Sequence, residues 1–167
     1  ELVIPNNIGG ECIKVIGNGA FEGCKGVKKI IISEGITEIH GSAFKNCTSL
    51  ENIIFPATLQ EIGYGAFKGC EQLKEINLPN SVQVISDECF SRCRALKEVL
   101  LPDNLEAIGK DAFCFTGLTE INIPASVKEL KGQAFFGCEH LAQIFLHEGL
   151  SSIGYGAFEY CNAMCSI

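Results

Sequence analysis

The chain repeats itself about every 23 residues, and this period restricts its fold more than any other feature of the sequence. Seven phenylalanines mark the repeat at intervals of 23, 23, 23, 23, 22 and 23 residues, namely Phe21, Phe44, Phe67, Phe90, Phe113, Phe135 and Phe158. Each follows Ala, except that Cys89 precedes Phe90. A fixed period of this length is typical of a solenoid, in which each repeat forms one coil and contacts only its neighbours.

Two apolar runs recur in each repeat. One has the form LxxIxL and usually ends at proline, as in residues 73–79 (LKEINLP), and the other resembles residues 81–85 (SVQVI). We expect the first run to form one parallel strand per coil, the second to form a strand on another face, and the AFxxC segment to form a short helical turn. A single repeat cannot bury enough apolar surface to offset the entropy lost on ordering its chain, so the coils must stack.

The repeats predict an α/β repeat solenoid: a right-handed leucine-rich-repeat superhelix of about seven 23-residue coils, with parallel β-strands and short helical turns. We expect one domain over residues 1–167. Residues 1–16 form an atypical first coil, because five residues are inserted there, and residues 6–12 (NNIGGEC) fit a loop. Residues 161–167 (CNAMCSI) start a further coil without a polar cap, which predicts an array cut from a longer one. With Glu1 in place of an initiator Met and no signal peptide, the segment resembles a mature chain or an excised fragment.

Ten cysteines are many for 167 residues, but their placement follows the repeat. Six lie three residues after the repeat phenylalanine, and Thr116 takes that position once; the six are Cys24, Cys47, Cys70, Cys93, Cys138 and Cys161. A ladder of disulfides between neighbouring coils is one interpretation, and a row of small buried side chains is the favoured one. A zinc site would need CxxC or Cys/His spacing, which the sequence lacks. The remaining four, Cys12, Cys89, Cys114 and Cys165, have no assigned role.

The residue before each ladder cysteine also follows a pattern. It is Gly23, Gly69, Gly137 or Asn46 in four repeats, and these residues tolerate a left-handed backbone. Three repeats depart from this pattern, with Arg92, Phe115 and Tyr160. Around Thr116 the repeat also loses one residue, which we expect to shorten a turn without disturbing the strands.

No catalytic constellation stands out in the sequence. The GxG of residues 63–67 and 154–158 (GYGAF) recurs at the repeat turn without a phosphate-loop motif, so we interpret it as turn geometry. The three histidines, His40, His140 and His147, occupy different repeat positions. None has a metal-ligand or catalytic-triad partner at a characteristic spacing. Acidic residues are scattered, so no general acid and base can be named. We therefore expect a protein that is not an enzyme and needs no cofactor.

Charge and hydropathy exclude two kinds of partner. The formal net charge is −7, which disfavours nucleic acid because phosphate binding needs clustered Lys and Arg. No apolar run approaches the ~20 residues that span a bilayer, so we expect no direct membrane insertion.

The combined motif LxxIxLPxSVxxIGxxAFxxCxx resembles the BspA-like, Treponema pallidum-type class of leucine-rich repeats. Residues 73–93 (LKEINLPNSVQVISDECFSRC) carry it in full, and residues 2–21 (LVIPNNIGGECIKVIGNGAF) resemble an opening repeat of such arrays. The resemblance covers essentially the whole chain. It implies an extracellular or cell-surface protein of a host-associated bacterium or protist, often acting in adhesion or host-protein binding. The family has no shared catalytic residues, so the resemblance assigns no site.

Side-chain alternation in the LxxIxL run predicts where a partner would bind. The two residues that flank the central Ile point out of the core, and they form two rows along the coils. The first row is polar and mainly acidic: Glu1, Lys29, Asn52, Glu75, Glu98, Glu120 and Gln143. The second row is mainly apolar: Val3, Ile31, Ile54, Asn77, Leu100, Asn122 and Phe145. Apolar side chains beside acidic ones favour a protein or peptide partner with apolar anchors and some positive charge.

We expect the candidate site to lie on a concave β-face made of Lys29, Ile31, Asn52, Ile54, Glu75, Asn77, Glu98, Leu100, Glu120, Asn122, Gln143 and Phe145. Strand propensity alone, or coverage by neighbouring chains, would also explain apolar residues there. Two other functions remain open: a structural spacer or stalk that carries other domains, which predicts a uniformly polar face, and an enzyme, which predicts turnover.

Overall fold

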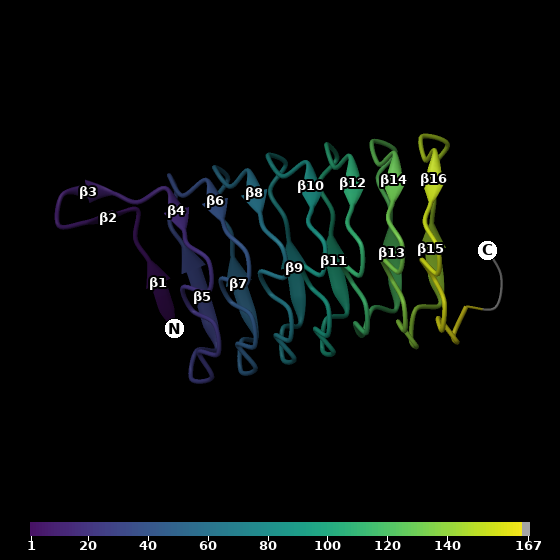
Figure 1. The fold of residues 1–167 in the computed structure, drawn as a ribbon, viewed down its shortest axis with the longest axis horizontal. Helices are drawn as coiled ribbons and strands as arrows, with labels where there is room; N and C mark the ends of the chain where they lie inside the picture. The colour runs from purple at the N-terminus through teal and green to yellow at the C-terminus, as the bar shows by residue number, and fades with distance from the viewer. Residues whose placement is uncertain (165–167) are drawn as a thin grey trace.

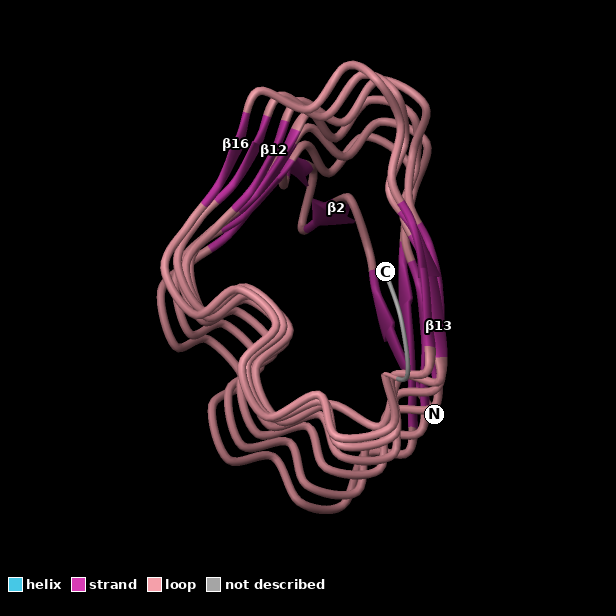
Figure 2. Cartoon of the chain, turned by 90° about the vertical axis from the view of Figure 1, so that its right-hand side faces the viewer, coloured by secondary structure: helices cyan, strands magenta, loops and turns pink. Residues whose placement is uncertain are grey.

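The chain forms a single stack of similar coils. The computed structural model describes residues 1–164 and shows a β-solenoid of about six turns, with the N-terminal and C-terminal coils at opposite ends (Figure 1). Viewed down the stack, the coils superpose and have three sides, namely two sheets and one side made of turns (Figure 2). The expectation of about seven coils is wrong, because the seven long strands enclose about six turns.

Each coil contributes one longer and one shorter strand. The longer strands are β1 (Leu2–Ile4), β5 (Lys29–Ile32), β7 (Asn52–Ile54), β9 (Glu75–Asn77), β11 (Glu98–Leu100), β13 (Glu120–Asn122) and β15 (Gln143–Phe145). The shorter strands are β4 (Val15–Ile16), β6 (Glu38–Ile39), β8 (Glu61–Ile62), β10 (Val84–Ile85), β12 (Ala107–Ile108), β14 (Glu129–Leu130) and β16 (Ser152–Ile153). We call the two sides that they form the long-strand face and the short-strand face.

The strands of successive coils pair in parallel, as predicted. The ladder of the long-strand face is interrupted twice, between β7 and β9 and between β11 and β13. The ladder of the short-strand face is interrupted once, between β8 and β10. The coils stay stacked across these interruptions because backbone hydrogen bonds outside the ladders also join them, such as that from Lys74 N to Glu51 O at 3.2 Å.

The predicted core positions are buried. Phe44, Phe67, Phe90, Phe113 and Phe135 are fully enclosed, and their rings stack in one continuous row that half-buried Phe21 and Phe158 extend at its ends. The ladder cysteines are buried beside this row, apart from half-buried Cys24. Five of their thiols donate to the carbonyl oxygen of the phenylalanine one coil earlier, and these are Cys47, Cys70, Cys93, Cys138 and Cys161. Thr116 is also a small donor in this slot, but its hydroxyl donates to the carbonyl oxygen of Phe113 in its own coil, at 2.9 Å.

The expectation of short helical turns is wrong, since no helix occurs among residues 1–164. In an α-helix each N–H bonds within its own turn. Here the N–H of Phe44 donates instead to Ala66 O of the next coil, at 2.8 Å. The residues two before and two after Phe44, Ser42 and Asn46, have left-handed φ values of 56° and 58°, which stop a helix from propagating. The class is therefore a β-solenoid and not α/β.

In every repeat, the residue before the ladder position has a left-handed backbone conformation. The prediction is confirmed for Gly23, Asn46, Gly69 and Gly137, and the three departures adopt the same conformation, with φ of 63° at Arg92, 56° at Phe115 and 61° at Tyr160. The second glycine of each GYGAF segment, Gly65 or Gly156, lies in the turn and has a positive φ, while the first glycine directly precedes the turn. The bulky residues are thus held in a conformation that suits glycine.

Residues 6–12, which were expected to form a loop, contain regular structure. They form an antiparallel hairpin of β2 (Asn7–Ile8) and β3 (Glu11–Cys12), which projects from the first coil (Figure 1). Gly9 and Gly10 both have positive φ, which a two-residue turn of this kind requires.

Two further expectations concern membrane insertion and the C-terminal coil. No helix long and apolar enough to cross a bilayer occurs in the described part of the chain. The further coil expected at residues 161–167 lies partly outside the described residues, as do Cys165 and Ile167.

Candidate functional site

The strand register aligns the outward side chains of the long-strand face as predicted. Val3 pairs with Ile31 and Ile31 with Ile54, Asn77 pairs with Leu100, and Asn122 with Phe145. In the polar row, Lys29 pairs with Asn52, Glu75 with Glu98, and Glu120 with Gln143. Of the twelve candidate residues, Lys29, Ile31 and Asn52 are half-buried and the other nine are exposed.

Two hollows open in this face where the ladder is interrupted. The smaller, of about 240 Å³, spans β7, β9 and β11 and is lined by Asn52, Glu75, Asn77, Glu98 and Leu100 together with two core isoleucines. The larger, of about 370 Å³, spans β11, β13 and β15, and its lining includes Glu98, Leu100, Glu120, Asn122 and Phe145. The structure thus brings eight of the twelve candidate residues together around the hollows. Lys29, Ile31, Ile54 and Gln143 lie outside them.

Leu100 occupies the centre of this surface. Its side chain is 64% exposed and borders both hollows. It also borders a third hollow beside the proline turns, which Pro79 and Pro102 help to line. Phe145, 51% exposed, stands at the far wall of the larger hollow. Such exposed apolar side chains beside concave surface are the kind of anchor that protein interfaces use.

The polar row contains two neighbouring glutamates that repel each other. Glu75 and Glu98 are direct neighbours across β9 and β11, and like charges in this position are destabilising. The amide of Asn52 donates to Glu75 Oε1 at 3.1 Å, whereas no ion pair of Glu98 occurs among the described residues. Lys29 lies 3.6 Å from the carboxylate of Glu1. The centre of the face therefore carries two adjacent carboxylates, and the nearby Lys97, which lines the same hollow as Glu98, forms no ion pair with Glu98.

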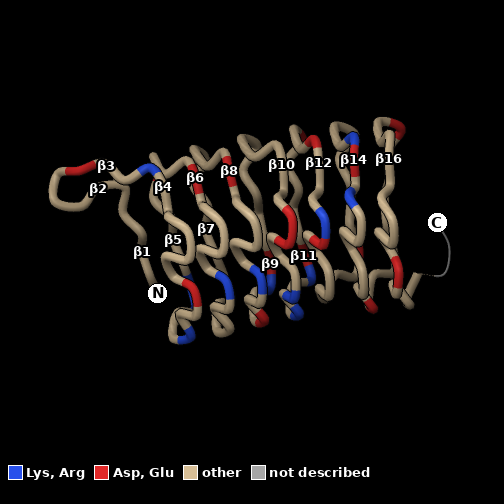
Figure 3. Tube along the Cα trace, in the orientation of Figure 1, with Lys and Arg blue, Asp and Glu red and all other residues tan. Residues whose placement is uncertain are grey.

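Sequence reasoning missed a third row of side chains beside the polar row. Lys97 and Thr119 belong to it and line the larger hollow. In the earlier coils Glu51 lies between Lys28, at 3.4 Å, and Lys74, at 2.6 Å, and the latter contributes most to lowering the pKa of Glu51. The signal was present in the sequence as charged residues that recur at the 23-residue period, namely Lys28, Glu51, Lys74 and Lys97. Acidic and basic residues are interspersed along the whole stack (Figure 3).

The short-strand face offers a comparison. Its paired outward residues are Val15, Glu38, Glu61, Val84, Ala107, Glu129 and Ser152. Large apolar side chains in this row are confined to two valines, in contrast to the isoleucines, leucine and phenylalanine of the long-strand face. An apolar row beside an acidic one is thus specific to the long-strand face.

The histidines are less isolated than expected. His40 contacts Glu38 at 2.9 Å, and His147 contacts Asn122 of the candidate site at 3.1 Å. His140 lines a hollow on the turn side of the coils. Within residues 1–164, no three His, Cys, Asp or Glu side chains are grouped so that they could hold a metal ion.

Comparison with known proteins identifies the repeat. The model of the BspA-type leucine-rich repeat region matches the chain in six copies, over residues 14–139 and 108–167. No curated protein matches the chain.

Three solved structures resemble the fold. A leucine-rich repeat protein of T. pallidum has a TM-score of 0.92 and 34% identity, over 97% of this chain and 76% of that protein. A leucine-rich cell surface protein from Faecalibacterium prausnitzii has a TM-score of 0.74 and 35% identity, over 79% of this chain and 36% of that protein. The pneumococcal vaccine antigen PcpA has a TM-score of 0.73 and 26% identity, over 89% of this chain and 40% of that protein. This chain therefore spans less than half of the latter two proteins.

Proposed function

Because the chain belongs to the BspA-type leucine-rich repeat family, we propose that it is a non-catalytic binding module of a cell-surface or secreted protein. Its long-strand face binds a protein or peptide partner, for which a host extracellular protein is the leading candidate. The F. prausnitzii relative is named a cell surface protein, and we extend that location to this chain.

The position of Leu100 is the observation that carries this proposal. This exposed leucine lies at the junction of three hollows, whereas Leu96 and Leu101 of the same coil are buried in the core without it. Burying it against a partner removes apolar surface from water. The neighbouring Glu75 and Glu98 add negative charge that a basic partner side chain would neutralise.

The spacer function predicts a uniformly polar face. The exposed Ile54, Leu100 and Phe145 argue against it. An enzyme, the remaining alternative, would consume a substrate, whereas a binding module shows only saturable capture.

The experiment is capture from host extracellular matrix and serum on the immobilised chain, followed by affinity measurement with the identified partner. Ile54→Glu, Leu100→Glu and Phe145→Glu leave the fold intact, because these side chains are exposed, and each weakens capture. Lys128→Glu is the matched control on the opposite side, since it precedes β14 and is exposed. Unchanged affinity in all three face variants would show that the partner binds elsewhere, and conversion of the partner to a product would favour the enzyme.

A further inference from the structure

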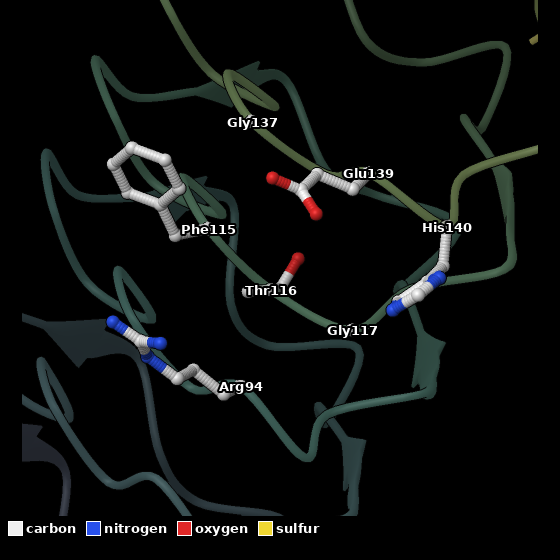
Figure 4. A pocket seen from close by; sticks show the side chains of 7 residues that line it. All are labelled: Arg94, Phe115, Thr116, Gly117, Gly137, Glu139 and His140. Carbon is white, nitrogen blue, oxygen red and sulfur yellow. The ribbon is translucent and has the colours of Figure 1, made fainter. Parts of the chain in front are cut away.

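A separate hollow lies on the turn side of the solenoid, away from both sheets. It has a volume of about 320 Å³ and is lined by Arg94, Phe115, Thr116, Gly117, Gly137, Glu139 and His140 (Figure 4). These residues come from the three successive coils of Phe90, Phe113 and Phe135. We call it the turn-side hollow.

The missing residue of the repeat explains this hollow. Two residues separate the ladder cysteine from the next leucine in the coil before, Arg94 and Ala95, and two in the coil after, Glu139 and His140. In the middle coil Gly117 stands alone in that interval. The shortened coil is drawn tightly against the preceding one, since a Cβ on Gly117 would lie 2.4 Å from the carbonyl oxygen of Arg94. The longer turns of the coils before and after therefore form the two sides of a hollow above the shortened coil.

An aromatic ring is held over this hollow at an energetic cost. Phe115 has a φ of 56°, which costs a bulky residue about 1–3 kcal/mol of backbone strain. Its side chain is 41% exposed, so a large part of the ring remains open to solvent. The ring lies against Gly137, where any Cβ would come within 2.5 Å of it, and meets Phe136 edge-on at 5.5 Å. Arg92 and Tyr160 share this left-handed backbone in their own coils, but of these three residues Phe115 alone lines the hollow, where its ring offers a fixed apolar surface.

The polar groups around the ring have unused hydrogen-bonding capacity. No ion pair or side-chain hydrogen bond of Arg94, Glu139 or His140 is found among residues 1–164. Arg94 only donates and an ionised Glu139 only accepts, and their formal charges cancel. The hollow is therefore suited to a neutral ligand that both donates and accepts hydrogen bonds and that also has an apolar face.

We propose that the turn-side hollow binds the end of a neutral saccharide. The C–H face of a sugar ring packs on Phe115, while its hydroxyl groups accept from Arg94 and donate to Glu139. The volume lies at the lower end of the ~300–1,000 Å³ typical of small-molecule sites, which suits one or two sugar units. A strongly anionic ligand would face Glu139, and a strongly cationic one would face Arg94, so charged ligands are disfavoured.

The test is binding of the whole chain to immobilised oligosaccharides that end in neutral hexose, deoxyhexose or N-acetylhexosamine units. Sialylated and sulfated oligosaccharides and unmodified short peptides are presented alongside. Saturable binding to one class of neutral ends is the expected result. Binding only to the acidic oligosaccharides, binding only to the peptides, or no binding at millimolar sugar would each overturn the proposal.

Substitutions of residues that line the turn-side hollow test whether the saccharide binds there. Phe115→Gly removes the ring, relieves the left-handed strain and so keeps the fold, and weakens saccharide binding at least about tenfold. Arg94→Met and Glu139→Gln each weaken it about tenfold through a lost charge-assisted hydrogen bond. Arg92→Gly is the matched control, because Arg92 holds the same left-handed position one coil earlier but does not line the hollow. Equal loss in the control and in Phe115→Gly would overturn the assignment.

This proposal is independent of the partner on the long-strand face. Leu100→Glu should leave saccharide binding unchanged, and Phe115→Gly should leave capture of the protein partner unchanged. Failure of one binding activity is thus distinguishable from failure of the other.

Discussion

The rings of Phe44 and Phe67 lie face to face, with centroids 5.2 Å apart and planes inclined by only 9°. The two residues are 23 positions apart in the chain, and both side chains are fully enclosed. The same relation recurs from coil to coil, so each ring is packed between the ring before it and the ring after it. The stack therefore couples the stability of neighbouring coils.

Phe67→Ala should lower the free energy of unfolding by about 3–5 kcal/mol, because it empties a fully buried site between two other rings. Chemical denaturation followed by circular dichroism measures this loss. Tyr155→Ala is the control, since that side chain is 84% exposed, and it should change stability by less than ~0.5 kcal/mol. An unchanged denaturation midpoint for Phe67→Ala would mean that the stacked row does not stabilise the coils.

The buried ladder thiols should react with alkylating reagents only after unfolding. Burial keeps reagents away from these side chains. It also raises the pKa of the ladder thiol Cys93 to about 12, and it raises that of Cys89, which lies outside the ladder, well above its usual value, so few thiolates form at these two residues near neutral pH. Cys12 is exposed on the hairpin and should be modified first. Mass spectrometry of the native and the denatured chain distinguishes these groups. A predominance of oxidised pairs between neighbouring coils would show instead that the ladder is a disulfide framework.

The ion pair between Lys68 and Glu88 should make stability depend on acid pH. The hydrogen bond from Lys68 is the main cause that lowers the pKa of Glu88, and a hydrogen bond with Tyr64 adds to it. A lowered folded-state pKa gives stability that is present above the unfolded pKa of about 4.3 and is lost as the pH falls through the folded value. Glu88→Gln should therefore cost about 0.5–1 kcal/mol at pH 7 and much less at pH 2. Equal cost at both pH values would assign the loss to packing.

The repeat made most of the fold predictable. Because each coil places the same residue types at the same positions, the core phenylalanines, the parallel register and the two outward rows all follow from a 23-residue spacing and side-chain alternation. The helical turn was mispredicted because the AFxxC pattern does not reveal that the N–H of Phe44 donates to the next coil. That bond depends on contacts between coils, which local propensity does not contain.

The candidate site was predictable as rows but not as hollows. Alternation places Leu100 and Glu98 on the surface. The interruptions of the ladder between β7 and β9 and between β11 and β13 concern pairing between coils, which side-chain alternation does not describe. Two sequence features coincide with the turn-side hollow. The repeat loses one residue near Thr116, and Phe115 occupies the position before the ladder residue where other repeats have glycine. Its walls come from the neighbouring coils, so the sequence pattern alone did not reveal it.

The acidic centre of the long-strand face should accelerate association with a basic partner. Glu75 and Glu98 repel each other across β9 and β11, and a cationic side chain placed between them would relieve this repulsion. The double variant Glu75→Lys/Glu98→Lys should therefore slow association about tenfold or more at low salt, whereas dissociation changes less. Stopped-flow or surface-based kinetics at two ionic strengths measure this, and the wild-type rate should fall as salt rises. The matched control is Glu61→Lys/Glu129→Lys, which makes the same change of net charge with exposed residues of the short-strand face. If both double variants slow association equally, net charge rather than the long-strand face attracts the partner.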